Sequence, residues 1–216
     1  MQFGMIFIAI LLLFTLLVSI KRQLSNTTLV TKSLLSVIFV LTALTTPHLN
    51  PAYSRLIVIG LVFCLAGDIC LVFNSRKAFL AGLSVFLLGH LAYVGAFFSI
   101  TDVNGWGMIS LAVAGTISGT VYAWLKPHLG SMKGPVIAYV VTITVMVAGA
   151  GSVAGVSHFS ATGRWLVAGG AIFFYLSDLF VARHQFVKDA FFNRAAGLPL
   201  YYLGQFFLAF SVGRIG

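Results

Sequence analysis

The stretch GLVFCLAGDICLVF, residues 60–73, places one carboxylate, Asp68, inside an otherwise apolar run that begins near residue 56. Apolar runs of about 17–25 residues are long enough to cross the hydrocarbon core of a bilayer as an α-helix. A charged side chain in such a helix costs about 2.5 kcal/mol or more on membrane-insertion scales, so it faces the protein interior. The stretch therefore predicts a transmembrane helix whose aspartate needs a functional or structural explanation.

Seven further apolar runs lie between charged, Pro, Asn or Gly boundaries. They cover residues 3–20, 29–46, 79–100, 106–125, 135–154, 164–182 and 198–213. Hydrophobic residues make up 60% of the chain and charged residues 8%, which is more apolar surface than a soluble domain can hide. Continuous runs also exclude the alternating strands of an outer-membrane barrel. We predict an all-α membrane protein, a bundle of eight transmembrane helices in a single integral membrane domain over residues 1–216.

Basic residues outnumber acidic ones by 13 to 4, yet they lie singly or in pairs between apolar runs, so we expect no nucleic-acid partner. One set of alternate connections carries Lys21, Arg22, Lys32, Arg76, Lys77, Lys126, Lys133, Arg183, Lys188 and Arg194. The other set carries Arg55, Arg164 and Arg214. The positive-inside rule assigns the richer side to the cytoplasm. We expect a multi-pass protein of a bacterial inner membrane with both termini outside the cytoplasm.

The third and seventh predicted helices resemble each other. The segment GAIFFYLSDLFVAR, residues 170–183, aligns with residues 60–73, so that Asp178 matches Asp68. In the helices that follow, a Leu-Gly pair precedes His90 in one half and Gln205 in the other. Four helices per half give both halves the same orientation in the membrane. The pattern predicts two like-oriented four-helix repeats, residues 1–104 and 105–216.

The two intramembrane aspartates are the candidate catalytic residues. Both are predicted in the half of the membrane near the basic connections, where they would share one cavity. Polar side chains at helical spacing around them are candidates for positioning substrate or water: His90, Tyr93, Tyr175, Tyr201 and Gln205. Two alternatives remain open, because the aspartates would also serve to lock helices together, and His90 is equally compatible with packing. Tyr122 and Tyr139 are expected in the aromatic belt at the membrane boundary.

Several functional classes lack their sequence motifs. The chain has no Glu and therefore no HExxH motif, and its five histidines are too far apart to form a local ligand pair. No G-x-S-x-G elbow, P-loop or dinucleotide-binding glycine pattern is found. We expect neither a metal nor another cofactor.

The segments AGDICLVF, FLLGHLAYV, YLSDLFVA and YYLGQFFLAF, together with the eight-helix pattern, resemble the YhhN-like family of lysoplasmalogenases. The resemblance implies hydrolysis of the vinyl-ether bond of a lysophospholipid within the bilayer, giving a fatty aldehyde and a glycerophospho-base. In such a reaction Asp68 and Asp178 would divide the acid and base roles, in an undecided order. The cations Arg76, Arg183 and Arg194 are weaker candidates for binding the lipid phosphate.

Two other functional classes fit the same features. A proton-coupled or small-molecule transporter also uses repeated halves and intramembrane acids. A structural protein would use the aspartates only for helix packing. The sequence does not determine the head group or the oligomeric state.

Overall fold

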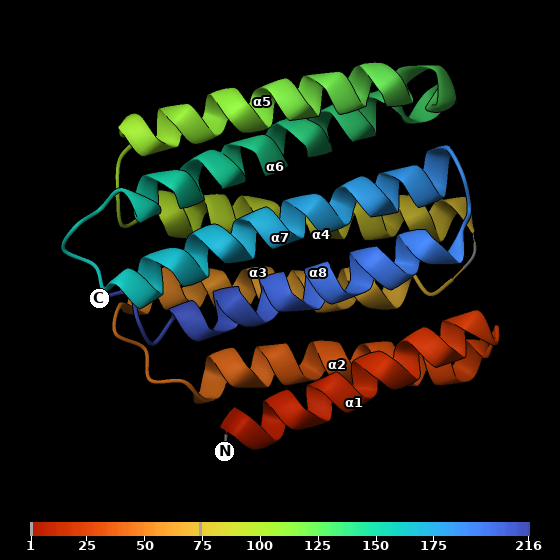
Figure 1. Cartoon of the computed structure of the whole chain (residues 1–216), viewed down its shortest axis with the longest axis horizontal. Helices are drawn as coiled ribbons and strands as arrows, with labels where there is room; N and C mark the ends of the chain where they lie inside the picture. The colour runs from red at the N-terminus through yellow and green to blue at the C-terminus, as the bar shows by residue number, and fades with distance from the viewer. Residues whose placement is uncertain (1, 74) are drawn as a thin grey trace.

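The computed structural model describes residues 2–73 and 75–216. Within these residues the chain is helical and contains no strand. The long helices are α1 (Gln2–Lys21), α2 (Ser25–Thr45), α3 (Pro51–Cys70), α4 (Arg76–Phe98), α5 (Gly105–Leu125), α6 (Lys133–Ala154), α7 (Ala161–Phe186) and α8 (Phe191–Ser211). Two short 3₁₀ helices, η1 (Lys126–His128) and η2 (Gly130–Met132), connect α5 to α6. Figure 1 shows the long helices lying side by side along one axis.

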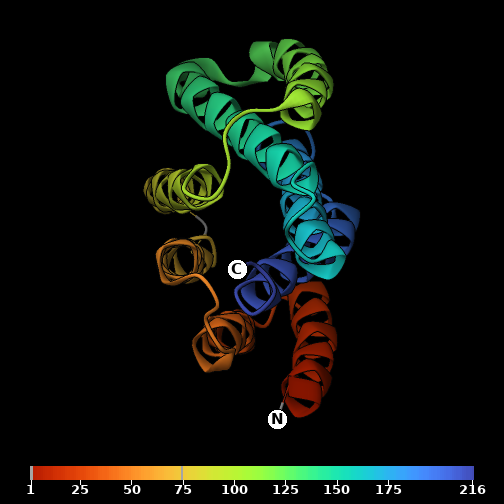
Figure 2. The same cartoon turned by 90° about the vertical axis from the view of Figure 1, so that its left-hand side faces the viewer.

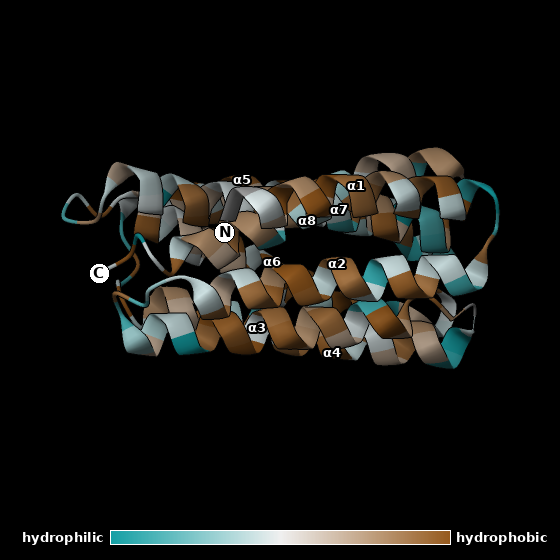
Figure 3. Ribbon diagram, turned by 90° about the horizontal axis from the view of Figure 1, so that it is seen from below, coloured by the Kyte–Doolittle hydropathy of each residue, from teal (hydrophilic) through white to brown (hydrophobic). Residues whose placement is uncertain are grey.

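Seven of these helices, α1 to α7, are long and apolar enough to cross a membrane. The eighth, α8, is less apolar because it carries polar side chains such as Asn193 and Gln205, both of which are buried inside the bundle. Apolar residues cover the helices along most of their length, and polar residues gather at the two ends (Figure 3). The predicted all-α membrane bundle of eight helices is thus confirmed, and the protein is an integral multi-pass membrane protein.

Helix starts are set by local capping. The side chains of Asn50 and Ser75 accept hydrogen bonds from backbone N–H groups three residues later, and those of Asn104 and Ser160 cap α5 and α7. Pro51 follows its cap at the first helical position, where its missing N–H costs nothing. These polar caps explain why the helices begin slightly before the apolar runs.

The largest boundary error in the sequence prediction is at α8. The helix begins at Phe191 rather than at residue 198, and Pro199 lies inside it. The apolar criterion failed here because Asn193 and Arg194 are polar but bind groups of α7 and of the connection before α8. Similarly, α7 extends to Phe186 beyond the predicted end at residue 182.

The helices form antiparallel neighbours. The connections α1–α2, α3–α4, α5–α6 and α7–α8 lie at one end of the bundle, and both termini lie at the other (Figure 1). Helices α3 and α4 pack along each other, as do α7 and α8, while α6 contacts α4, α5 and α7. Viewed along the helices, α8 lies between α7 and the α2–α3 side (Figure 2). The largest cluster of buried apolar residues lies between these helices.

Close backbone crossings occur at equivalent places in the two predicted halves. A Cβ atom on Gly89 would lie 3.2 Å from the carbonyl oxygen of Gly60, and one on Gly204 would lie 2.8 Å from that of Gly170. These are the glycines that the sequence alignment of the two halves pairs. The pairs α3/α4 and α7/α8 therefore share one packing geometry, while the division into repeats at residue 104 stays a prediction.

Two other glycine pairs, each with its members four residues apart, differ in their contacts with neighbouring helices. Gly151 of α6 and Gly155, which caps its end, pack closely against α5 and the residue that caps it. Gly115 and Gly119 of α5 have the same spacing but make no such contact, because no heavy atom of a neighbouring helix lies within 4 Å of a Cβ built on either residue. That face of α5 points away from the bundle.

Candidate active site

A cavity of about 880 Å³ opens at the end of the bundle where the α3–α4, α5–α6 and α7–α8 connections lie. Asp68 and Asp178 both line it. On α4 the lining runs from Arg76 to Phe86, which is about 15 Å of helix, so the cavity ends near mid-membrane. Much of its wall is an apolar cluster on α4, the α5–α6 region and α6: Phe79, Leu125, Leu129, Met132 and Val136.

Asp68 is almost fully enclosed by groups that donate to it. Its Oδ1 lies 3.1 Å from Nζ of Lys32, and the Asp68 side chain is 2% exposed. Its Oδ2 accepts hydrogen bonds from the hydroxyls of Ser36, at 2.6 Å, and Tyr201, at 2.7 Å. The partners come from α2 and α8, so this one carboxylate joins three helices.

Asp178 has fewer partners and more room. Its Oδ2 accepts a hydrogen bond from the Tyr139 hydroxyl at 2.7 Å and lies 3.6 Å from Nε2 of His90. Within the described part of the chain, Oδ1 makes no hydrogen bond, and the side chain is 16% exposed. Because Asp178 lines the cavity, this oxygen is open to a bound molecule.

His90 is buried on α4 and directed toward Asp178. Its Nδ1 lies 2.7 Å from the carbonyl oxygen of Phe86, to which it donates. Its Nε2 is buried without a hydrogen-bond partner among the described residues. The ring packs against Phe174, with ring centroids 4.4 Å apart, and edge-on against Tyr139. The contacts hold the imidazole in one orientation, with Nε2 facing the carboxylate.

The four other predicted positioning residues separate into two pairs. Tyr175 and Tyr201 line the cavity, where the Tyr201 hydroxyl binds Asp68 and the Tyr175 hydroxyl lies 2.9 Å from that of Ser118. Tyr93 and Gln205 bind each other, with a 2.8 Å hydrogen bond from the tyrosine hydroxyl to Oε1.

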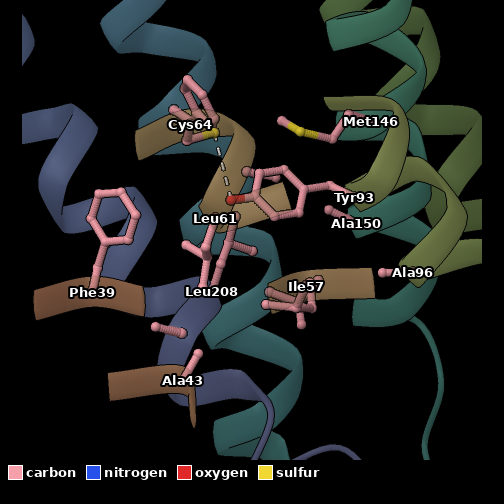
Figure 4. Packing of buried hydrophobic residues seen from close by; sticks show 14 of the residues in the cluster. Phe39, Ala43, Ile57, Leu61, Cys64, Tyr93, Ala96, Met146, Ala150 and Leu208 are labelled. Atoms are coloured by element: carbon pink, nitrogen blue, oxygen red, sulfur yellow. Dashed lines mark hydrogen bonds between the residues drawn. The ribbon is translucent and has the colours of Figure 1, made fainter. Parts of the chain in front are cut away.

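The Tyr93–Gln205 pair lies in the apolar interior. Figure 4 shows the Tyr93 hydroxyl directed at Cys64 among apolar side chains, and the two atoms are 3.7 Å apart. Neither Tyr93 nor Gln205 belongs to the cavity lining. The prediction that they position substrate or water thus gains no support from their placement.

The three predicted phosphate-binding cations also differ in whether they line the cavity. Arg76 and Arg194 line the mouth of the cavity, where they bind Ser131 and His184 respectively. Arg183 does not line the cavity and instead donates to Oδ1 of Asn193 at 2.5 Å, which fixes the α7–α8 connection. This placement gives no support to the prediction that Arg183 binds the lipid phosphate.

The sequence predicts two residues of the site, Lys32 and Tyr139, to lie outside it. The charge pattern places Lys32 among the cations of a connection, but the residue is buried on α2 against Asp68. The sequence predicts Tyr139 in the aromatic belt, yet its hydroxyl donates a hydrogen bond to Asp178. Lys32 lies inside a predicted apolar run, and a lone cation there is a signal for an intramembrane partner. No comparable signal separates Tyr139 from an ordinary boundary tyrosine.

Comparisons with known proteins identify relatives of this chain. The YhhN family model matches residues 27–212. Human lysoplasmalogenase TMEM86A is 36% identical over 171 residues, which cover 75% of this chain and 66% of the human protein. Rat lysoplasmalogenase TMEM86B is 31% identical over 164 residues, covering 76% of this chain and 64% of the rat protein.

A bacterial relative is also found. A lysoplasmalogenase of Mycobacterium tuberculosis is 28% identical over 130 residues, covering 58% of this chain and 46% of that protein. The chain thus spans just under two thirds of the length of the mammalian relatives and about half of the mycobacterial one. No solved structure gives a significant match. The family match covers most of the chain, including both aspartates, and the chain belongs to the YhhN family.

Proposed function

We propose that this protein is a lysoplasmalogenase, which hydrolyses the vinyl-ether bond of a lysophospholipid to a fatty aldehyde and a glycerophospho-base. One observation carries the proposal: two carboxyl groups from α3 and α7 line a single cavity with an apolar wall and a basic mouth. The names of the mammalian and mycobacterial relatives support the same activity.

The chemistry of a vinyl ether matches these groups. Hydrolysis begins when an acid protonates the alkene carbon that is not bound to oxygen, leaving an oxocarbenium ion. Water then adds to the carbon beside the oxygen, and the hemiacetal breaks into an aldehyde and an alcohol. These reaction steps need a proton donor, a base that activates water and a negative charge near the cation. Asp68 and Asp178 provide carboxyl groups for these tasks.

The cavity also suits an amphipathic substrate. The apolar cluster at Phe79, Leu125 and Met132 would contact the alkenyl chain. Arg76 and Arg194 at the mouth would bind the phosphate, because guanidinium groups donate several hydrogen bonds to phosphate oxygens. Tyr175 on α7 and Tyr201 on α8 would orient the substrate or the attacking water.

The same geometry supports the expected membrane orientation. The mouth lies at the bundle end that carries Arg76, Lys188 and Arg194, and both termini lie at the opposite end. The positive-inside rule supports a mouth facing the cytoplasm and termini outside, in a bacterial inner membrane. The substrate would then be drawn from the cytoplasmic leaflet.

A transport function has less support. A transporter needs access to its binding site from both sides of the membrane. The cavity lining is confined to the helix halves near one end, and on α4, which has 23 residues, it stops at Phe86. A cavity closed at mid-membrane fits an enzyme that takes and releases lipid on one side.

The proposal is tested by incubating purified protein in detergent micelles with lysoplasmalogen and measuring fatty aldehyde. The matched control is the saturated-ether analogue, which has no alkene to protonate. We expect aldehyde from the vinyl ether and none from the analogue. A folded protein that releases no aldehyde from lysoplasmalogens with choline or ethanolamine head groups would contradict the proposal.

A further inference from the structure

Asp68 and Asp178 occupy matching places in the sequence but have different surroundings. We infer that Asp178, coupled to His90, exchanges the protons of the reaction, whereas Asp68 is a fixed carboxylate that Lys32 holds in place. The inference rests on the proposed hydrolase function and deepens it by dividing the roles. Lys32 acts through Asp68 and is therefore a positioning residue.

Both oxygens of Asp68 are already engaged by groups of the protein. Lys32 occupies Oδ1, and the hydroxyls of Ser36 and Tyr201 occupy Oδ2. An ammonium group donates hydrogen bonds and cannot accept one. Protonation of Asp68 would remove the negative charge that pairs with Lys32 and leave the ammonium buried without a counter-charge, which is costly. The surroundings keep Asp68 ionised throughout the reaction, and its charge stabilises a nearby cation.

Asp178 has the opposite arrangement. Only Oδ2 is engaged, by the Tyr139 hydroxyl and more distantly by His90, and no cationic Lys or Arg pairs with it in the described part of the chain. Oδ1 remains open to the cavity. This oxygen can reach a bound molecule while Oδ2 keeps its contact with the protein.

His90 supplies a second place for the proton. Because Nδ1 donates to the Phe86 carbonyl, the neutral ring carries its lone pair on Nε2, which has no hydrogen-bond partner and faces Oδ2 of Asp178 at 3.6 Å. A small movement of either side chain would close this gap to a hydrogen bond. The pair can hold one proton on either the carboxyl or the imidazole.

The reaction balances with this pair. Asp178 gives its proton to the alkene carbon, whose π electrons form the new C–H bond, and an oxocarbenium ion results beside the Asp68 carboxylate. Water adds to the cation and loses a proton to Asp178 or His90. The pair then gives its proton to the departing ether oxygen and takes up the hydroxyl proton of the hemiacetal as the carbonyl group forms. One water is consumed, and Asp178 is again protonated.

The two halves of the protein contribute crosswise to this division. His90 on α4 belongs to the first half but faces Asp178 on α7, and Tyr201 on α8 belongs to the second half but binds Asp68 on α3. The residue aligned with His90 is Gln205, which cannot take up a proton at neutral pH and binds Tyr93 instead. Among the described residues, only Asp178 of the two aspartates thus has a proton-accepting partner.

The division is tested by the pH profile of kcat for lysoplasmalogen hydrolysis. The double variant Lys32→Met/Asp68→Asn removes both charges together, so it leaves no unpaired buried ion. We expect it to fold, to lose about 10²-fold in kcat through the missing negative charge, and to keep the wild-type shape of the profile. Asp178→Asn is expected to lose about 10²–10⁴-fold.

His90→Gln and Tyr139→Phe complete the set, with thermal unfolding as a check on folding. We expect His90→Gln to remove or displace one limb of the profile and Tyr139→Phe to shift the same limb. The division is overturned if the folded double variant loses or displaces that limb, or if folded His90→Gln keeps the wild-type profile. A wild-type protein that releases no aldehyde would instead overturn the proposed function, and this inference with it.

Discussion

Nζ of Lys32 lies 3.1 Å from Oδ1 of Asp68 in the interior of the bundle, where the two side chains are 10% and 2% exposed. Two opposite charges are thus removed from both water and lipid at the junction of α2 and α3. A buried pair of this kind is sensitive to the loss of one partner, because the other charge is then left uncompensated.

Lys32→Met should destabilise the protein more than the double variant Lys32→Met/Asp68→Asn does. Breaking a buried pair typically costs about 3–5 kcal/mol, whereas removing both charges is often nearly neutral. Thermal unfolding in detergent, followed by circular dichroism, measures the difference. Equal unfolding temperatures for the single and double variants would show that the two charges are not coupled.

Gly204→Ala should lower stability by about 1–3 kcal/mol, because an added Cβ meets the backbone of α7 at Gly170 and Phe174. Gly115→Ala is the matched control, since a Cβ there has no neighbour within 4 Å. We expect the control to be neutral or stabilising by up to about 1 kcal/mol, through helix propensity alone. Thermal unfolding of both variants tests whether α7 and α8 approach as closely as the structure has them.

Arg194→Gln should raise KM for lysoplasmalogen by about 10- to 100-fold, because a lost hydrogen bond to a charged phosphate costs about 1.5–3 kcal/mol. Arg183→Gln is the control, because its side chain binds Asn193 outside the cavity. We expect this control to lower the unfolding temperature and to leave KM close to the wild-type value. Steady-state kinetics on both variants and the wild-type protein measure KM. If Arg194→Gln and the wild-type protein have equal KM values, Arg194 does not bind the phosphate.

Tyr93→Phe should reduce stability by about 1–3 kcal/mol, because it leaves the buried carbonyl of Gln205 without its hydrogen bond. Tyr201→Phe removes a donor from Asp68 inside the cavity. We therefore expect Tyr201→Phe to lower kcat by a larger factor than Tyr93→Phe does. Aldehyde release and thermal unfolding, measured on both variants, separate the effect on catalysis from the effect on stability. A larger kcat loss for Tyr93→Phe would contradict the placement of Tyr201 in the cavity and Tyr93 outside it.

Much of the fold could be predicted from the sequence, because a lipid environment permits few solutions. Each spanning segment must satisfy its own backbone hydrogen bonds, so a continuous apolar run of the right length is a helix. The exception was α8, where Asn193 and Arg194 hid the start of the helix. Their hydrogen bonds to neighbouring groups compensate for their polarity, and such bonds are tertiary contacts.

The sequence by itself determined that Asp68 and Asp178 lie inside the membrane, since few acids interrupt its apolar runs and burial in lipid is costly. Only the tertiary structure decided what surrounds them, because their partners come from helices distant in the chain. It paired Asp68 with Lys32 and Tyr201, and it placed His90 and Tyr139 beside Asp178. Helical spacing fixes which residues share a face of one helix, but packing between helices fixes which faces meet.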